Sequence, residues 1–233
     1  MIRLDDRLRC AFEMLRGSAA VADIGSDHGK LTAALLLEGG CRRVIAGDIS
    51  PDCLQKTREI IERYGLQDRA QVRLGSGLTV LSPGECDAAA ILGMGGELMV
   101  ELLTSSPEVA EGLDRLVLQP MSGIEELREW LYENSWQVLS DKLVPLGKRW
   151  YQVLCVRKAA RKDPWPESFP DRCWLVGYRS FADRETGLKE YCLEQLNKRR
   201  ERLKHAAGTG GEGKLQREAG QLEEIVKEIE GWN

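Results

Sequence analysis

The chain has 233 residues, of which 30% are charged and 42% hydrophobic, and its formal net charge is −4. This composition is ordinary for a globular protein, and it excludes a chain that is basic throughout, so any site for a polyanion must be a local patch. The seven cysteines form no CxxC pair and there are only two histidines, which argues against a structural metal site or a disulfide framework and predicts a reducing, cytoplasmic location.

The first sixteen residues carry charges throughout and lack the apolar core of a signal peptide. Apolar residues recur there at helical spacing, at Leu4, Leu8, Ala11 and Leu15. We therefore expect a surface helix packed on the domain. No apolar run approaches the ~18 residues of a membrane span, so we expect no membrane association.

Strand and helix patterns alternate from residue 19 to about residue 158. Strands are predicted at Ala20–Ile24, Arg43–Asp48, Ala70–Leu74, Asp87–Leu92 and Leu116–Gln119. Helices are predicted at Lys30–Glu38, Pro51–Tyr64, Glu97–Leu103 and Ile124–Asn134. Two further strands form a hairpin around the turn 145–148, at Trp136–Val144 and Arg149–Arg157. Repeated βα units predict a parallel sheet, and the hairpin adds an antiparallel strand at its edge. A dehydrogenase domain would instead continue with parallel strands.

The remaining residues predict a second, helical domain. Residues 159–170 form a proline-rich linker, and helices follow at Arg184–Ala207 and Lys214–Glu230 around the glycine-rich turn 208–213. Their apolar residues recur at coiled-coil spacing, at Leu188, Cys192, Leu196 and Leu203 and then at Leu215, Ala219, Leu222, Val226 and Ile229. We expect an antiparallel helical hairpin, with a domain boundary between residues 158 and 159. The tail pairs either with itself or with a second subunit, giving a monomer or a weak dimer.

The first predicted strand ends in a turn with the spacing Asp-x-Gly-x-x-x-Gly, from Asp23 to Gly29. Dinucleotide-binding proteins have the motif Gly-x-Gly-x-x-Gly at this place, and this turn lacks one of its glycines. The difference argues against a dinucleotide whose pyrophosphate packs on the helix N-terminus. A methionine-derived nucleoside has no phosphate and tolerates the change. Gly25 would admit that cofactor, and Asp23 would orient the turn or bind its amino group. The alternative is a turn that only connects strand to helix, which would leave Asp23 buried with no evident partner.

The second strand ends at Asp48, whose carboxylate is predicted to accept hydrogen bonds from both ribose hydroxyls, with Ile49 in the same site. The alternative, that Asp48 caps the next helix, is weakened because Ser50 already suits that position. The loop Gly75-Ser76-Gly77-Leu78 after the third strand is expected beside the adenine, which adds Ser76 and Gly77. The alternative for this loop is a plain turn.

The segment Gly93-Met94-Gly95-Gly96 follows the fourth strand, where a parallel sheet opens its ligand crevice. We expect an exposed loop that brings the backbone of Gly93, Met94 and Gly95 near the reacting centre. The Asn/Asp-Pro-Pro-aromatic loop common in amino-group methyltransferases is absent, which argues against attack by an exocyclic amine.

These motifs occur together with three others, at 118–120 (Leu-Gln-Pro), 127–131 (Leu-Arg-Glu-Trp-Leu) and 147–151 (Gly-Lys-Arg-Trp-Tyr). In this order they resemble the bacterial tRNA (adenine-N1)-methyltransferases that modify adenine 22, over roughly residues 1–158. The resemblance implies a Rossmann-like class I methyltransferase domain, S-adenosylmethionine as cofactor and tRNA as partner. The family usually has Asn after Gln-Pro, where this chain has Met121.

In neutral adenine, N1 carries an in-plane lone pair and is itself the nucleophile, so proximity and electrostatics should dominate catalysis. A carboxylate near N6 could orient the base and stabilise its developing charge. Asp27 is the candidate catalytic residue, by its place in the turn and by the resemblance; the alternative is that it caps the following helix. Ser26 and His28 are assigned to the cofactor site, and the alternative for His28 is a packing or capping role.

Basic residues of the tail are predicted to bind tRNA, at Lys198, Arg199, Arg200, Arg202 and Lys204. The alternative is a solvated face with glutamate partners. Lys148, Arg149 and Trp150 in the hairpin are predicted to contact the RNA as well. Two rival functions stay open: a methyltransferase acting on another RNA base or a small molecule, and a cofactor-binding pseudo-enzyme whose tail recruits a partner.

Overall fold

The computed structural model describes residues 2–161, 174–206, 208 and 210–232. The contacts divide the chain into two compact units, Met1–Asp163 and Pro164–Asn233. The predicted linker spans this division, and its part from residue 162 onward lies outside the described residues. The functional boundary predicted after residue 158 stays a prediction.

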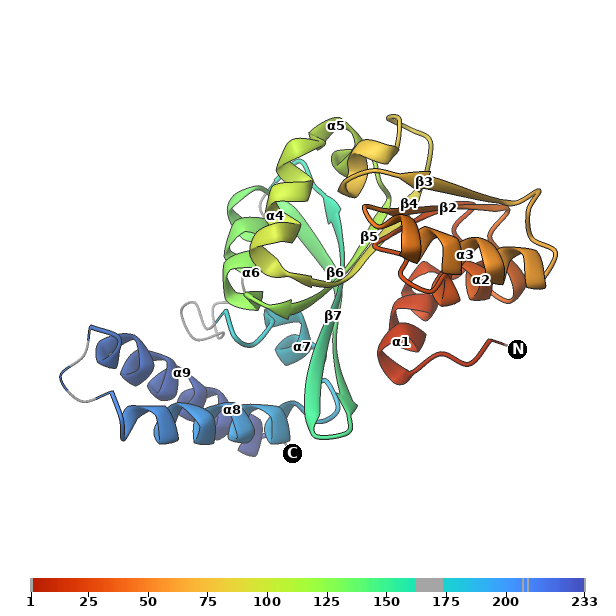
Figure 1. Ribbon diagram of the computed structural model, residues 1–233. Helices are drawn as coiled ribbons and strands as arrows, with labels where there is room; N and C mark the ends of the chain where they lie inside the picture. The colour runs from red at the N-terminus through yellow and green to blue at the C-terminus, as the bar shows by residue number, and fades with distance from the viewer. Residues whose placement is uncertain (1, 162–173, 207, 209, 233) are drawn as a thin grey trace. The chain divides into compact units, whose positions relative to one another are not determined.

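The first unit is built on a seven-stranded sheet in the order β3-β2-β1-β4-β5-β7-β6 (Figure 1). Its strands are β1 (Ala20–Ile24), β2 (Arg43–Asp48), β3 (Ala70–Leu74), β4 (Ala88–Gly95), β5 (Arg115–Ser122), β6 (Trp136–Leu146) and β7 (Arg149–Lys158). The pairs among β1 to β5 are parallel, and β7 runs antiparallel to both β5 and β6. The predicted Rossmann-like sheet with a terminal hairpin is confirmed. The strand order reverses between β1 and β4, and ligands bind beyond the carboxyl ends of the strands at such a point.

Six helices pack on the sheet (Figure 1). These helices are α1 (Asp6–Leu15), α2 (Lys30–Leu37), α3 (Pro51–Arg63), α4 (Gly96–Ser105), α5 (Pro107–Glu111) and α6 (Ile124–Glu133). Helices α2 and α3 contact β2 and β3, α4 contacts β4 and β5, α5 and α6 contact the terminal hairpin, and α1 contacts α2 and the strands β4 to β7. The short α5 and the 3₁₀ turn η1 (Gly77–Val80) were not predicted, because neither is long enough to show a helical period.

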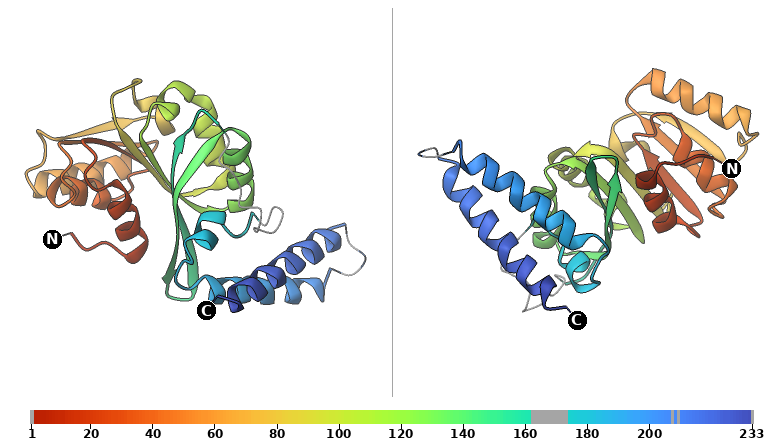
Figure 2. Two further views of the ribbon diagram at one scale, coloured as in Figure 1. Left: turned by 180° about the vertical axis from the view of Figure 1, so that it is seen from behind. Right: turned by 90° about the horizontal axis from the view of Figure 1, so that it is seen from below.

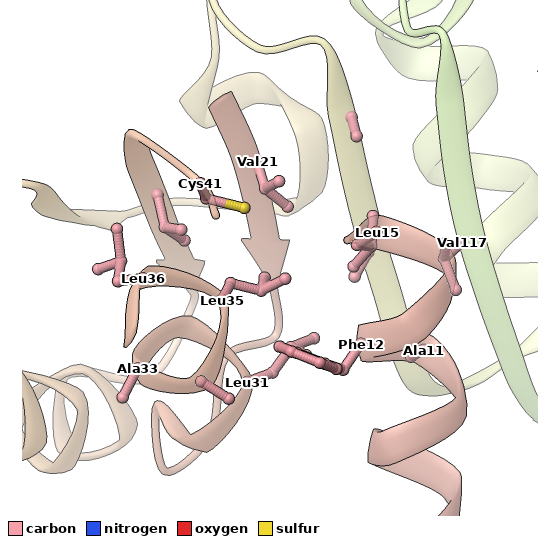
Figure 3. Packing of buried hydrophobic residues seen from close by; sticks show 14 of the residues in the cluster. Ala11, Phe12, Leu15, Val21, Leu31, Ala33, Leu35, Leu36, Cys41 and Val117 are labelled. Atoms are coloured by element: carbon pink, nitrogen blue, oxygen red, sulfur yellow. The ribbon is translucent and has the colours of Figure 1, made fainter. Parts of the chain in front are cut away.

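The predicted N-terminal helix packs on the domain, as expected. Its fully buried Phe12 and Leu15 join a core with Val21 of β1 and Leu35 of α2 (Figure 3). Burying one such side chain stabilises the fold by roughly 1.5–3 kcal/mol. This contact fixes the start of the chain beside the carboxyl end of β1.

The expectation of an exposed loop at residues 93–96 is wrong. Strand β4 continues to Gly95, with Met94 opposite Pro120 and Gly95 opposite Ser122 of β5 across two irregular steps of register. Gly96 then opens α4 with no room for a Cβ, which would meet the carbonyl oxygen of Gly123. Gly96 therefore allows the start of α4 and the backbone of Gly123 to approach closely, and the residues before it form a strand rather than a free loop.

The second unit contains α7 (Tyr178–Ala182), α8 (Leu188–Leu203) and α9 (Glu212–Glu230). Helix α8 starts four residues later than predicted because Gly187, with φ +82°, is its N-cap. Helices α8 and α9 lie antiparallel and side by side in both views of Figure 2, which confirms the helical hairpin. Their buried faces use the predicted positions, with Cys192 and Leu196 on α8 and Leu222 and Val226 on α9. None of the helices in the described part of the chain has the length and apolar character that crossing a bilayer requires.

Candidate cofactor and catalytic site

A cavity of about 430 Å³ opens at the carboxyl ends of β1 and β4, where the strand order reverses. It brings together the predicted site residues Asp23, Gly25, Ser26, Asp27, His28, Gly93 and Met94. It also contains residues that the sequence did not point to, namely Asp5, Arg7, Leu8, Lys30, Leu31 and Leu92. The remaining predicted cofactor residues, Asp48, Ile49, Ser76, Gly77 and Gly95, lie at the same edge of the sheet but do not line this cavity.

The turn after β1 is held tightly by its glycines and by β2. The backbone N–H groups of Gly25 and Ser26 both donate to the carbonyl of Gly47, at 2.8 and 3.3 Å. Gly25 has φ +72°, and a Cβ there would lie 2.5 Å from the Cε of Met94. Met94 therefore packs directly against the turn, and the positive φ of Gly25 is what favours glycine at this position.

Asp23 is buried and does have a partner, contrary to the argument made from sequence. Its Oδ2 accepts hydrogen bonds from the backbone N–H and the hydroxyl of Thr32, at 3.1 and 2.7 Å. Burial raises the pKa of Asp23 to about 6; the Thr32 bonds oppose the shift, and the charges of Asp48 and Asp27 add to it. Asp23 thus ties β1 to the first turn of α2 while lining the cavity.

Asp23→Asn should change how stability depends on pH. The pKa of Asp23 is about 6 in the folded chain against an ordinary 3.8, so between these values the folded state binds more protons. Folding stability contributed by this group is therefore present at low pH and is lost as pH rises through about 6, by about 3 kcal/mol in all. Urea denaturation from pH 3 to 8 should show wild type losing that much relative to the variant. A difference that stays constant with pH would contradict the assignment.

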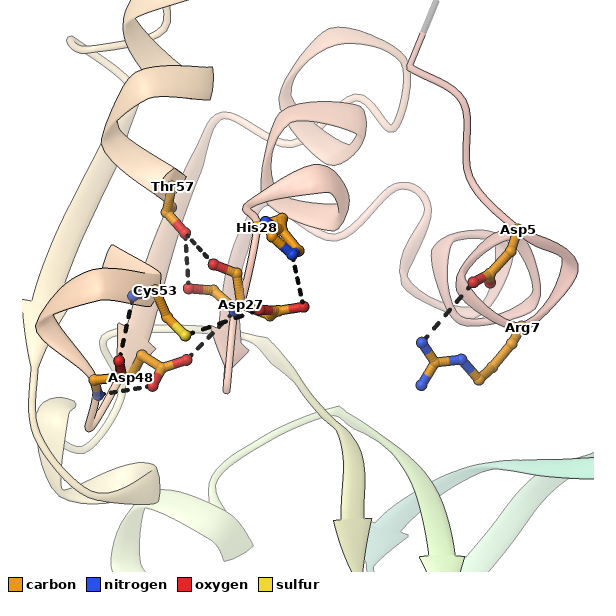
Figure 4. A network of polar contacts seen from close by, with 9 residues as sticks. Asp5, Arg7, Asp27, His28, Asp48, Cys53 and Thr57 are labelled. Carbon is orange, nitrogen blue, oxygen red and sulfur yellow. Dashed lines mark hydrogen bonds and ion pairs between the residues drawn. The ribbon is translucent and has the colours of Figure 1, made fainter. Parts of the chain in front are cut away.

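Asp27 lies at the centre of a polar network that joins the β1 turn to α3 (Figure 4). Its backbone N–H donates to Oδ2 of Asp48 at 3.3 Å, and its Oδ2 is 3.6 Å from Nε2 of His28. The Cys53 thiol lies 3.8 Å from its Oδ1. The N-cap of α2 is Gly29 and not Asp27, so the alternative that Asp27 caps this helix is wrong. Its carboxylate is 65% exposed and faces the cavity rim.

Asp48 is half-buried at the end of β2, and its Oδ1 accepts from the backbone N–H of Ser50 at 2.9 Å. Ser50 caps α3 through a bond from the N–H of Cys53, so Asp48 is not the cap, as predicted. The neighbouring apolar side chain of Ile49 is 72% exposed. Each carboxylate oxygen of Asp48 keeps acceptor capacity for a ligand hydroxyl.

The two predicted site residues in the loop after β3 differ in their burial. Ser76 is exposed, whereas Gly77 is buried with φ +53°, and a Cβ there would collide with Leu102 of α4. The lack of a Cβ at Gly77 therefore lets η1 pack against α4. The cofactor roles predicted for Ser76 and Gly77 stay predictions.

Arg7 was missed because nothing in an amphipathic surface helix marks one arginine among several. Its Nη1 donates to Oε1 of Gln119 at 2.6 Å, across 112 positions of sequence. Gln119 is fully buried and donates from Nε2 to the carbonyl of Pro120 at 2.8 Å and toward Sδ of Met121 at 3.5 Å. Met121 thus supplies a soft acceptor where the family usually has an amide.

The residues predicted to bind tRNA occupy both units. In the hairpin turn Lys148 and Arg149 are exposed and Trp150 is half-buried. In α8, the surface position expected for Arg199 is wrong, because its side chain is 8% exposed and its Nε lies 3.0 Å from Oε2 of Glu218. Several exposed cations have glutamate partners, at Lys198–Glu194, Arg200–Glu223 and Lys204–Glu201. Arg202 is exposed.

No group of three or more His, Cys, Asp or Glu side chains suited to a metal ion occurs among the residues that the structure describes. The described cysteines, Cys10, Cys41, Cys53, Cys86, Cys155 and Cys192, are free thiols.

Comparison with known proteins identifies this architecture. Residues 4–154 match the family model described as a methyltransferase domain. A tRNA (adenine(22)-N(1))-methyltransferase of Bacillus subtilis is 30% identical over 98% of this chain and 97% of its own length. The crystal structure of the B. subtilis m1A22 tRNA methyltransferase TrmK superposes with a TM-score of 0.84 at 26% identity, over 97% of this chain and 100% of that one.

A structure of Streptococcus pneumoniae Sp1610 in complex with S-adenosyl-L-methionine shares the fold, with a TM-score of 0.83 at 23% identity over 96% of this chain and 100% of that chain. The family model covers the first unit from residue 4 to residue 154, within β7, and the B. subtilis relative extends through both units. This chain belongs to the family of tRNA (adenine(22)-N(1))-methyltransferases.

Proposed function

We propose that this protein transfers the methyl group of S-adenosylmethionine to N1 of an adenine in tRNA, at position 22 as the name of the B. subtilis relative states. The observation that carries the proposal is the likeness to that relative along 98% of the chain. The cavity at the strand-order reversal supports it, because this is where a parallel sheet receives a nucleoside.

The residues present fit such a cofactor, which supplies an electrophilic methyl group when bound. Gly25 leaves bare backbone on the cavity side of the turn, and Asp48 offers a carboxylate at the neighbouring strand end. We assign Asp48 to the ribose hydroxyls and Asp23 to the amino group of the methionine end. Ile49, Ser76, Gly93 and Met94 complete the proposed cofactor contacts.

The chain's own contribution to the reaction is placement and charge. Adenine N1 needs no deprotonation before attack, so the protein must hold the base in line and stabilise positive charge on the ring. Asp27 is the exposed carboxylate at the cavity rim, and we assign it to the N6 edge of the base, where it can accept a proton after transfer. His28, 3.6 Å away, is placed to orient that carboxylate.

Asp48→Ala should weaken S-adenosylmethionine binding by more than tenfold, or about 1.4 kcal/mol, because the ribose loses its acceptor. Isothermal titration calorimetry measures this directly. Asp52→Ala, an exposed acid four residues further on, is the matched control and should bind normally. Equal affinities of wild type and Asp48→Ala would remove Asp48 from the site.

Incubation with labelled S-adenosylmethionine and unmodified bacterial tRNA, followed by nucleoside mass spectrometry, tests the function itself. The expected product is N1-methyladenosine, and a tRNA with guanine at position 22 should not yield it. Label in another nucleoside or in a small molecule would support a different methyltransferase. Cofactor binding without transfer would support a pseudo-enzyme.

We further propose that the exposed cations bind the tRNA backbone, at Lys148, Arg149, Lys198, Arg200, Arg202 and Lys204. Arg199 is left out because it is buried against Glu218. Trp150 is proposed to stack on an unpaired base. Because α8 and α9 already cover each other's apolar faces within one chain, we propose a monomer. We also propose a cytoplasmic location, which a tRNA substrate supports.

A further inference from the structure

Thr57 of α3 is a fully buried residue whose hydroxyl meets the turn that carries Asp27 (Figure 4). Its Oγ1 donates to the carbonyl oxygen of Asp27 at 3.4 Å and lies 3.2 Å from Oγ of Ser26. Both partners belong to the turn after β1 and not to α3. The hydroxyl therefore connects the helix to the turn.

The backbone of Asp27 depends on such partners. Its φ of +48° lies in the left-handed region, where a residue with a side chain stays only when its surroundings hold it. The N–H of Asp27 donates to Oδ2 of Asp48 at 3.3 Å, and Thr57 holds the carbonyl of the same residue. Loss of the Thr57 bond leaves the residue free to relax toward an ordinary φ, which moves its carboxylate.

Thr57 also fixes the distance between α3 and the turn. A Cβ at Gly29 would lie 2.9 Å from Cγ2 and 3.0 Å from Cα of Thr57, so the backbone of the turn lies directly against this residue. One helical turn earlier on α3, Sγ of Cys53 is 3.8 Å from Oδ1 of Asp27. Helix α3 thus contacts both the backbone and the side chain of Asp27.

We propose that Thr57 is a positioning residue for the methyl transfer, because its hydroxyl holds Asp27 in the conformation that presents the carboxylate to the cavity. This inference rests on the proposed function, in which Asp27 acts on the adenine. Thr57 is 0% exposed and is not among the residues that line the cavity, so it acts through Asp27 and not by touching a ligand.

Two substitutions of the full-length protein separate the hydroxyl from the rest of the side chain. Thr57→Val keeps the shape without the hydroxyl, and at saturating S-adenosylmethionine and tRNA it should lower kcat about tenfold. Thr57→Ser keeps the hydroxyl without the methyl group and should retain at least about half of the wild-type kcat. Calorimetry should show that the Kd for S-adenosylmethionine changes less than about twofold in both. Thr104→Val is the matched control, because its hydroxyl donates at 2.8 Å to a carbonyl of its own helix, and its kcat should equal that of wild type.

A double variant tests whether Thr57 acts through Asp27. In the Asp27→Asn background, Thr57→Val should change kcat less than about twofold, because the carboxylate that it positions is already gone. A further tenfold loss in that background would show independent effects and overturn the inference. It would also be overturned by a kcat of Thr57→Val equal to that of wild type, or by equal losses in Thr57→Val and Thr57→Ser.

If Thr57→Val does not fold, Thr57→Ala and Thr57→Ser give the same comparison, since these two differ only in the hydroxyl. Thr57→Ala should then be the slower variant by about tenfold, and equal rates would overturn the inference. Failure of wild type to methylate tRNA would remove the proposed function itself. That result is distinct from an active wild type whose kcat does not respond to the Thr57 hydroxyl.

Discussion

Asp27→Asn should methylate tRNA about a hundredfold more slowly than wild type while binding S-adenosylmethionine with nearly unchanged affinity. The side chain of Asp27 is 65% exposed and lines the cavity, so it is open to a bound ligand rather than buried in the protein interior. An amide of the same shape keeps the position but cannot stabilise positive charge or accept a proton. The loss should therefore appear in kcat, measured at saturating cofactor and tRNA.

The backbone of Asp27 decides which variants are informative. Its φ of +48° lies in the left-handed region, which Asn and Gly tolerate but Ala adopts only with strain. Asp27→Gly, which removes the carboxylate without straining the turn, should lose as much activity as Asp27→Asn. Asp68→Asn, at an exposed acid before β3, serves as the control and should be fully active. Full activity of Asp27→Asn would end the catalytic assignment.

Asp141→Ala should destabilise the first unit by about 3–5 kcal/mol, because it leaves the guanidinium of Arg128 without its counter-ion in the interior. The two groups are 2.8 Å apart, with side chains 4% and 1% exposed. Arg128, on α6, also donates to Gln152 of β7, so the ion pair connects a covering helix to both strands of the terminal hairpin. Equilibrium urea denaturation followed by circular dichroism measures the loss.

Two further variants show whether the loss of stability comes from burial of the ion pair or from the loss of an ion pair as such. Glu111→Ala breaks the more exposed pair with Lys158, whose side chains are 47% and 28% exposed, and should cost less than about 1 kcal/mol. Replacing both partners, with Arg128→Met and Asp141→Leu, should recover most of the stability because no charge is left buried. A loss from Asp141→Ala no larger than that from Glu111→Ala would refute the argument.

The sheet could be predicted closely because its strands are either buried on both faces or bounded by turn residues. The bounds of β1, β2 and β3 agree with those observed. The prediction of a loop at Gly93–Gly95 was wrong, because glycines are typical of loops when only the local sequence is considered. Pairing with β5 makes this segment part of a strand. Helix α8 was predicted too long because Gly187 and Arg184, which has φ +50°, end the preceding turn through backbone conformation.

The sequence predicted only those site residues that come directly after a strand in the chain. Asp23, Gly25 and Asp27 were found because the turn after β1 is continuous in sequence, and they do line one cavity. Arg7 and Asp5 could not be found, since their places depend on how α1 packs against a core assembled from distant segments. The Thr32 partner of Asp23 and the burial of Arg199 likewise arise from packing that no local pattern encodes.

The pairing of Met94 with Pro120 gives one wall of the cavity the stiffness of a sheet. Such a wall cannot fold over a bound molecule like a flap, so this side of the enzyme works as a slot whose shape exists before any ligand arrives. The conformational entropy of this segment is lost when the chain folds, so ordering the segment adds no further cost when tRNA binds. Changes of specificity should therefore come from the side chains that rim the slot rather than from the length of this segment.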